Sequence, residues 1–276
     1  MRTSTTTVAS PFLAAPRMAR TSKGRDTEVR QLLRVHWLEM SRNRSSFIFV
    51  LIFPFLMLGM FLGLTHLMSS TTEQAPDFSV VIVPMGLCLA ITGTCTTLTA
   101  GPIAEYRSKG TLRALSTTPI SRSSFLLTHM AVRLILSFLL SGALIVLGMV
   151  LGIVGIDSLG RVLIASIPTT ILFLGVGYLI GGLMKSGQGA TNLATAVQLI
   201  ALFTSGVAFP FTLLPESALK IVNLLPTAYF GDLLFWTTGS PLQRYSTWLD
   251  FLIVTICALV IVPLAIRTFR WDTREK

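Results

Sequence analysis

Six apolar runs, each about as long as a membrane-crossing helix, constrain this chain more than any other feature. We place the runs at Phe47–Met68, Ser79–Ala100, Phe125–Gly152, Val162–Met184, Thr191–Phe211 and Trp248–Phe269. A helix of about 20 apolar residues crosses the roughly 30 Å hydrocarbon core of a bilayer. Because lipid cannot satisfy unpaired backbone groups, such runs must be helical. The sequence therefore predicts an all-α polytopic membrane protein whose residues 47–276 form a domain of six transmembrane helices.

The distribution of the few charged residues predicts how these helices are oriented in the membrane. Only 12% of the chain is charged and 52% is hydrophobic, which excludes a soluble domain of this length. Residues 1–46 hold nine Lys and Arg, 101–124 hold four and 267–276 hold four, whereas the opposite side has only Arg161, Lys220 and Arg244. Basic residues concentrate on the cytoplasmic side of membrane proteins. We therefore expect a multi-pass protein of the cell membrane with both termini in the cytoplasm, and no nucleic-acid partner.

The residues before the first run divide into two parts. Residues 1–27 are rich in Ser, Thr and Arg without periodicity, and we expect a disordered cytoplasmic tail. Over residues 28–40 the apolar side chains, including Leu33 and Trp37, recur on one face of a helix. A basic amphipathic helix of this kind lies at a membrane surface or packs on a partner. We predict an interfacial connecting helix over residues 28–46.

The segment between the fifth and sixth runs is apolar but too broken to cross a membrane. Residues 212–247 are rich in Leu, and prolines lie before and within them at Pro210, Pro215 and Pro226. Each half is shorter than a transmembrane helix. We predict an outer re-entrant helical segment over residues 212–235, in which these prolines form an outer gate. Two further spans are the alternative, and they would place three charged side chains in lipid.

No catalytic or nucleotide-binding motif occurs in the sequence. A Walker A loop, a G-x-S-x-G elbow and an H-E-x-x-H metal site are all missing. The three cysteines, Cys88, Cys95 and Cys257, lie within apolar runs and are expected to be packing residues. We therefore expect no enzyme, no catalytic residue and no cofactor or metal bound by this chain. Asp250 opens the sixth run and is expected to cap that helix.

Several polar side chains interrupt the apolar runs. Thr94 and Thr97 belong to the second run, and Asn192 and Gln198 belong to the fifth. They line a substrate path in one hypothesis; the alternative is interhelical packing, which selects the same residue types. Arg133 must either reach the cytoplasmic surface or pair within the bundle. Close helix crossings are expected where glycines recur four residues apart, at Gly59/Gly63, Gly148/Gly152 and Gly177/Gly181.

Four parts of the chain follow one another in an order that carries a family resemblance. They are the helix at 28–40, the segment Glu105–Leu112, the turn Thr118–Ser121, and the outer stretches Ser205–Pro210, Leu214–Pro215 and Leu225–Tyr229. Over roughly residues 28–270 this order resembles the permease subunit of type-2 ATP-binding-cassette (ABC) exporters, and drug and antibiotic efflux permeases in particular. The family often has an acid directly after Gly-Thr-Leu, where this chain has Arg113.

The resemblance implies how such a chain is driven. Residues 101–124 would form a coupling loop seated on an ABC ATPase, which is present in two copies and carries the ATP and Mg²⁺. A second permease chain, identical or homologous, would complete the complex in the lipid bilayer of a bacterial cell. The residues implied in ATPase coupling are Glu105, Arg107, Gly110, Leu112 and Leu115. Leu33 and Trp37 would anchor the connecting helix.

The expected function is therefore an export permease for a lipophilic or amphipathic compound, a drug or natural product, driven by ATP hydrolysis on a separate subunit. Within the family, a polysaccharide or lipid substrate is the alternative. An intramembrane enzyme would need a nucleophile–base pair or metal ligands, and the sequence offers neither. An assembly subunit without transport would not need a coupling loop. The direction of transport follows from the resemblance alone.

Overall fold

A computed structural model describes residues 30–34, 36–38, 44–69, 79–111, 122–209, 211 and 214–268. Every regular element among these residues is a helix, which confirms the predicted all-α fold. The connecting helix is described at 30–34 and 36–38, whereas the predicted tail at 1–27 lies outside the described residues. The other elements are α2 (Arg44–Ser69), α3 (Ser79–Thr92), the π-helix η1 (Gly93–Thr97), α4 (Leu98–Ser108), α6 (Arg122–Val150), α7 (Asp157–Leu183), α8 (Gly187–Thr204), α9 (Glu216–Val222), α10 (Pro226–Thr238) and α11 (Thr247–Thr268).

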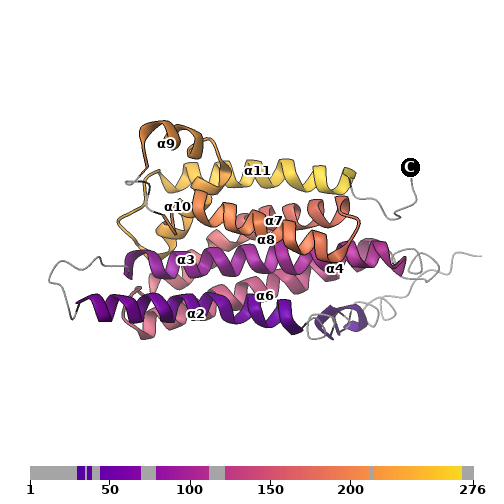
Figure 1. The fold of residues 1–276 in the computed structure, drawn as a ribbon, viewed down its shortest axis with the longest axis horizontal. Coiled ribbons are helices and arrows are strands. Elements are labelled where there is room, and N and C mark those ends of the chain that lie inside the picture. The colour runs from indigo at the N-terminus through magenta and orange to yellow at the C-terminus, as the bar shows by residue number, and fades with distance from the viewer. Residues whose placement is uncertain are drawn as a thin grey trace, which may run out of the picture.

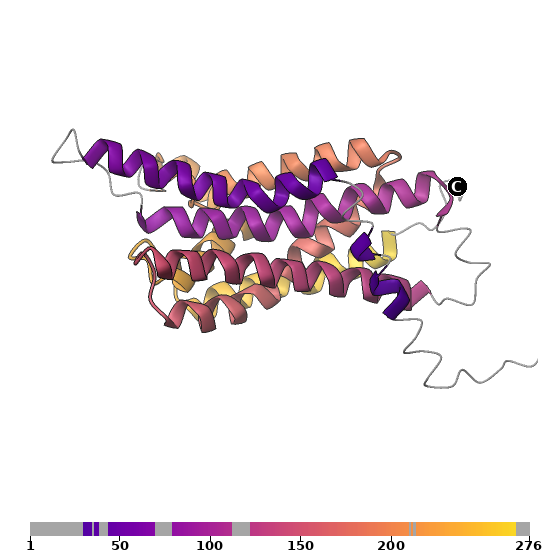
Figure 2. The same cartoon turned by 90° about the horizontal axis from the view of Figure 1, so that it is seen from below.

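The long helices lie side by side in one bundle (Figures 1 and 2). The chain passes along it through α2, the continuous run α3–η1–α4, and then α6, α7, α8 and α11, and α7 packs against α4, α6, α10 and α11. The connecting helix, the end of α4 and the end of α11 share one end of the bundle (Figure 1). We call it the basic end, for Arg34, Lys109, Lys185 and Arg267. α9 and α10 lie at the other end.

Five stretches are long and apolar enough to cross a membrane, namely α2, α3 through α4, α6, α7 and α11. α8 has 18 residues, which span about 27 Å, but Gln188 and Asn192 make its first half polar. In Figure 1 it nevertheless runs from the basic end to the end that holds α9 and α10, so it is the sixth helix of the bundle. α9 and α10 are bent by 89° at a short break, which fits a broken span as well as a re-entrant segment, so the re-entrant segment remains a prediction.

Two of the predicted boundaries were wrong. The second run does not end at Ala100 but continues as α4 to Ser108, so the predicted coupling loop begins as a helix. The five-residue π-helix η1 lies directly before it, where the wider turn adjusts the backbone ahead of Pro102. α8 ends at Thr204, well before the predicted Phe211. The break follows at Gly206, whose φ of +80° is a left-handed conformation that glycine adopts without strain.

Glycines on α7 allow it to reach the buried centre of the bundle. A Cβ atom at Gly177 would lie 2.3 Å from the carbonyl oxygen of Cys95, and one at Gly181 would lie 2.9 Å from that of Ala100. The backbone of α7 therefore crosses η1 and α4 in direct contact, as the G-x-x-x-G spacing predicts. Gly59 on α2, by contrast, has no atom within 4 Å of an added Cβ. The same spacing on α2 makes no close crossing within the described part of the chain.

Candidate functional site

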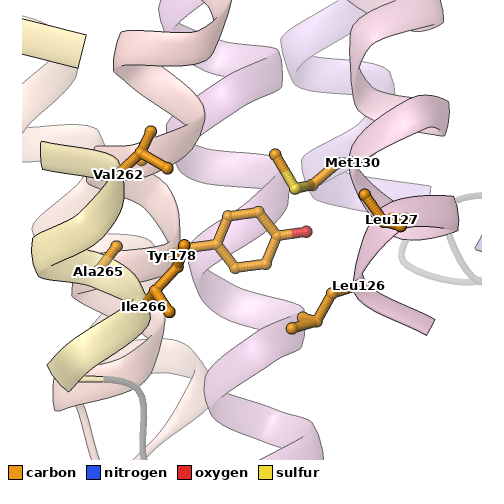
Figure 3. A pocket seen from close by; sticks show the side chains of 8 residues that line it. Leu126, Leu127, Met130, Tyr178, Val262, Ala265 and Ile266 are labelled. Atoms are coloured by element: carbon orange, nitrogen blue, oxygen red, sulfur yellow. The ribbon is translucent and has the colours of Figure 1, made fainter. Parts of the chain in front are cut away.

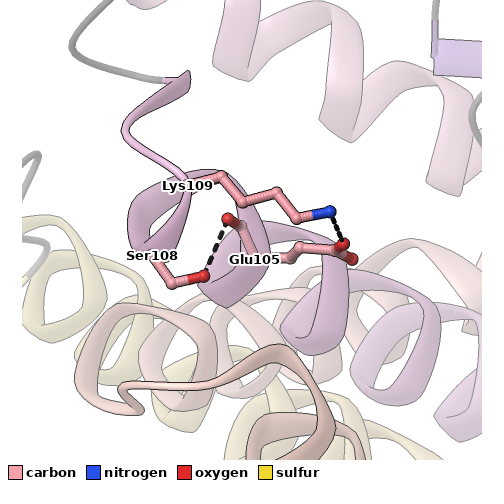
Figure 4. Close-up of polar contacts among 3 residues, drawn as sticks. All are labelled: Glu105, Ser108 and Lys109. Atoms are coloured by element: carbon pink, nitrogen blue, oxygen red, sulfur yellow. Dashed lines mark hydrogen bonds and ion pairs between the residues drawn. The ribbon is translucent and has the colours of Figure 1, made fainter.

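The predicted coupling residues that the structure describes lie at the end of α4, at the basic end of the bundle. The ammonium group of Lys109 forms an ion pair with the Glu105 carboxylate one turn away, and Ser108 Oγ donates to the Glu105 carbonyl at 3.0 Å (Figure 4). Gly110 has a φ of +70° and ends the helix in a left-handed turn. Glu105, Ser108 and Lys109 are all exposed. The end of α4 therefore presents a small charged surface.

Arg107 does not project from this surface as the coupling hypothesis expects. Its side chain is 5% exposed, and Nη1 donates to the carbonyl oxygens of Gly181 at 3.1 Å and Met184 at 3.3 Å. The last carbonyls of a helix have no partners within the helix and carry its negative dipole end. Arg107 therefore holds the end of α7 against α4. A contact between Arg107 and a partner protein remains a prediction.

Replacing Arg107 with methionine should destabilise the protein by about 2 kcal/mol, because hydrogen bonds from a charged donor to buried carbonyls are lost. The measurement is the thermal unfolding midpoint of the detergent-solubilised protein. Lys109→Met is the matched control, since its exposed ion pair contributes at most about 1 kcal/mol. Equal shifts in the two variants would show that Arg107 does not anchor α7.

The connecting helix contacts the bundle through residues that sequence reasoning did not select. Leu32 and His36, one turn apart, are buried, whereas Leu33 is half-buried and Trp37 is 49% exposed. Leu33 still packs against the hydrophobic core. The amphipathic pattern predicted the helix correctly. It did not show which residues of the apolar face contact the bundle. Trp37 is thus available to lipid or to a partner.

His36 packs among aromatic rings from two other elements. Its ring centroid lies 4.8 Å from that of Phe125 and 5.0 Å from that of His129, both edge to face. Tyr106, near the end of α4, lies 5.8 Å from Phe125. Each such pair contributes about 0.5–1.5 kcal/mol beyond burial of area. These four residues, which we call the His36 cluster, join the connecting helix, α4 and α6 in one contact.

His129 connects the His36 cluster to the interior of the bundle. Its Nδ1 lies 2.7 Å from Tyr178 Oη, and its Nε2 lies 3.5 Å from Arg133 Nη2. A guanidinium can only donate, so Nε2 accepts and Nδ1 carries the proton that it donates to Tyr178. Arg133 is 1% exposed. Of the two alternatives for Arg133, the structure has the one in which it interacts within the bundle.

Beyond His129, α6 and α7 place polar side chains opposite one another. His129 faces Tyr178, and further along the helices Ser137 Oγ lies 3.3 Å from Thr170 Oγ1. Both pairs fit one antiparallel register, and the same register puts buried Ser141 opposite buried Ser166. Polar pairs of this kind are interhelical contacts in membrane proteins. The two hydrogen-bonded pairs hold α6 against α7.

Two of the four residues of the substrate-path hypothesis lie in contact with each other. Thr97 Oγ1 donates to Gln198 Oε1 at 3.2 Å, so these two lie together between η1 and α8. Thr94 is buried and donates to a carbonyl of its own helix one turn back. Asn192 is exposed on α8. These contacts are those of helix packing, and a substrate path past these residues remains a prediction.

At the other end of the bundle, two of the three gate prolines shape the re-entrant segment. Pro215 is the N-cap of α9, and Pro226 is the first residue of α10, positions where the missing N–H of proline is tolerated. Pro226 therefore starts α10 at the bend between the two helices. Gating by these residues remains a prediction. The other predicted site residues, Pro210, Leu112 and Leu115, lie outside the described residues.

A buried carboxylate holds the loop that joins α10 to α11. The two oxygens of Asp232 accept the backbone N–H groups of Arg244 at 2.8 Å and Tyr245 at 2.7 Å. Asp232 is 3% exposed. The guanidinium of Arg244 lies 4.6 Å from the centroid of the Phe211 ring, so the loop is also packed against the segment that follows α8. Sequence reasoning treated Asp232 only as a charge that disfavours a span.

Asp250 does not cap α11 as predicted. Its side chain is fully buried, and neither carboxyl oxygen has a hydrogen-bond donor among the described residues. It adjoins the carboxyl group of Asp232 instead. Two carboxyl groups in contact repel one another when both are ionised. The residue thus joins α11 to α10 rather than ending a helix.

A model of the family described as ABC-2 family transporter protein matches residues 67–267, from the end of α2 to the end of α11. The chain belongs to the ABC-2 transporter family. No individual curated protein matches it. Members of the ABC-2 family are the transmembrane subunits of ABC transporters, so this ABC-2 protein is a multi-pass permease rather than an enzyme, and an ABC ATPase is its implied partner.

Proposed function

We propose that this ABC-2 permease exports a lipophilic or amphipathic compound and that a separate ATPase drives it from the basic end. The observation that carries the proposal is the His36 cluster. It joins the connecting helix to the end of α4 and the start of α6 through edge-to-face ring contacts. A partner that moves the connecting helix would therefore move two bundle helices at once.

The surface for that partner is the end of α4 with the segment that follows it. Glu105 and Lys109 are exposed there and would orient the ATPase rather than supply most of the affinity. Leu112 and Leu115, which we expect to be buried in the ATPase, come directly after the described end of this surface. Two ATPase copies and a second permease chain follow from the symmetric assembly that we expect.

Cytoplasmic placement of the basic end is supported by charges within the described residues. Eight described Lys and Arg lie on elements that begin or end there, whereas three lie at the other end. The eight are Arg30, Arg34, Arg44, Arg107, Lys109, Arg122, Lys185 and Arg267, and the three are Arg161, Lys220 and Arg244. This division follows the positive-inside rule. With this orientation, α9 and α10 would face the outside as the exit of the path.

A lipophilic or amphipathic cargo suits the described interior better than a sugar polymer. Several polar groups in the centre of the bundle bond each other or their own helix, as in the Thr97–Gln198 pair and Thr94. A polysaccharide would need a row of unengaged donors and acceptors. The path of the substrate would lie between the two permease chains, since each bundle is packed at its centre.

Replacing His36 with alanine should uncouple ATP hydrolysis from transport. The variant removes the ring that links the connecting helix to α6, at a cost of about 1–3 kcal/mol spread over its two aromatic contacts, but leaves the ATPase surface intact. In the reconstituted complex we expect ATPase binding to persist while substrate flux per ATP falls roughly ten-fold.

Trp37→Ala is the matched control, since Trp37 is one residue away but half exposed. It should change flux per ATP far less than His36→Ala. If His36→Ala keeps the wild-type ratio of flux to hydrolysis, the His36 cluster is not the coupling contact.

A further inference from the structure

A long apolar groove runs along one face of α7 beside α11. It consists of two adjoining cavities of about 330 and 410 Å³ that share Val262 of α11. Cavities of this size hold small molecules in proteins. The floor is a single helical face of α7, formed by Ile164, Pro168, Ile171, Gly175 and Tyr178.

The half of the groove nearer the basic end has walls from two helices. Leu126, Leu127 and Met130 of α6 form one wall, and Val262, Ala265 and Ile266 of α11 form the other (Figure 3). Leu127 and Ile266 are 65% and 70% exposed, so the groove opens to the surroundings of the bundle, which for these spans is lipid. Among the lining residues of this half, Tyr178 alone has a polar side chain, and its hydroxyl is bonded to His129.

The length of the groove fits a lipid chain. Its α11 side extends from Phe251 to Ile266, about 24 Å along a helix axis. One leaflet contributes about 15 Å of hydrocarbon, half of a bilayer core. An acyl chain that enters at the basic end therefore has room to lie along α7 without leaving the groove.

The charge at the mouth of the groove favours an anionic headgroup. Arg267 follows Ile266 in the last turn of α11 and is exposed, and Lys185 is exposed just beyond the end of α7. Of the acids that the structure describes, only Glu105 belongs to an element that ends here, and it is paired with Lys109. An anionic phosphate would thus meet two cations at the depth where lipid headgroups lie.

We propose that this groove is a binding site for an anionic phospholipid of the leaflet at the basic end, with an acyl chain over Tyr178 and the headgroup phosphate at Arg267. A second copy of this chain is a poorer occupant. Two copies in one membrane share one orientation, so a two-fold contact across the groove would bring both Arg267 side chains together. The site rests on the geometry of α6, α7 and α11 and holds whatever cargo the permease carries.

A lipid in this groove would contact Tyr178, which is hydrogen-bonded to His129 of the His36 cluster. The ring of Tyr178 is the floor beneath the acyl chain, and its hydroxyl bonds His129 of the His36 cluster. An occupied groove would keep the Tyr178 ring packed and the His129 bond formed. Loss of the lipid would leave that floor exposed to the groove.

The test compares phosphatidylglycerol with phosphatidylcholine of the same acyl chains. Each is added to delipidated protein in detergent, and retained lipid is measured by native mass spectrometry. We expect phosphatidylglycerol to be retained roughly ten-fold better. Ala265→Trp, which fills the groove from its α11 wall, should abolish that retention, and Arg267→Gln should lower it to the level of phosphatidylcholine. Val260→Trp, at an exposed α11 position outside the groove, should change neither value.

A second measurement needs no variant and so does not depend on how Ala265→Trp folds. Phosphatidylglycerol with a photoactivatable acyl chain is crosslinked to the wild-type protein, and the label should concentrate in residues 126–130 and 262–266. Label spread evenly over the exposed faces of α2, α6 and α11 would overturn the proposal. Label that disappears when two permease chains associate would assign the groove to the second copy. Wild-type retention by Ala265→Trp would also refute the site.

Discussion

Replacing Gly177 with valine should prevent the bundle from packing, with a loss of about 3 kcal/mol or more in the free energy of unfolding. The first added carbon alone would lie 2.3 Å from the Cys95 carbonyl oxygen and 3.1 Å from Thr99 Cβ. The first of these atoms is backbone in the buried π-helix η1, so it cannot move as a side-chain end can. α7 would have to separate from the centre of the bundle, and the thermal unfolding midpoint in detergent should fall accordingly.

Gly59→Val provides the matched control, because it adds the same side chain to a membrane helix where nothing lies within 4 Å of the Cβ. We expect a change within about 0.5 kcal/mol for the isolated chain. Equal losses in both variants would mean that valine acts through helix propensity and not through the α7 crossing.

Replacing Asp232 with alanine should release the loop between α10 and α11. Two partly buried N–H groups, those of Arg244 and Tyr245, would lose their acceptors, at about 1–3 kcal/mol each. Relief of the unfavourable contact with Asp250 offsets part of this cost, so we expect a net loss of about 3 kcal/mol. The measurements are the unfolding midpoint and the rate at which trypsin cleaves after Arg244.

Asp232→Asn removes the negative charge but keeps a hydrogen-bond acceptor, so it tests the two contributions separately. The amide oxygen still accepts one N–H, and the amide nitrogen can donate to the Asp250 carboxylate, whose oxygens have no other donor among the described residues. We expect a loss of about 1 kcal/mol. If asparagine destabilises the loop as much as alanine does, the negative charge rather than the accepted hydrogen bonds holds it.

Much of the fold could be predicted because lipid imposes a simple length and hydropathy rule. The runs that became α2, α6, α7 and α11 were placed within a few residues of their observed ends. The prolines at Pro215 and Pro226 likewise indicated where the re-entrant segment is divided. α8 was recognised as a bundle helix despite its polar first half, because apolar residues fill its second half.

The contacts of individual side chains were harder to predict from the sequence, because they depend on residues distant in the chain. Arg107 looked like a surface charge, yet its partners are carbonyls at the end of α7. His36 and Trp37 are adjacent on one amphipathic face, and the positions of Phe125 and His129 on α6 decide that His36 is the one that packs inward. Asp250 lies at the start of a predicted helix, as a capping residue does, but in the structure its carboxyl group adjoins that of Asp232 on α10. Helical periodicity identifies the apolar face of a helix. Which residues that face packs against depends on the tertiary structure.

The most direct test of the proposed function is ATP-dependent flux through the reconstituted complex. The permease is purified with its ATPase from the native membrane and placed in proteoliposomes, and movement of a fluorescent lipophilic dye is followed with and without ATP. We predict that the ATPase co-purifies with the wild-type chain and that flux requires ATP. Leu112→Asp should abolish both, because it would bury an unpaired carboxylate in the ATPase at a cost of several kcal/mol. Flux that continues without ATP, or a Leu112→Asp variant that keeps both binding and transport, would contradict the proposal.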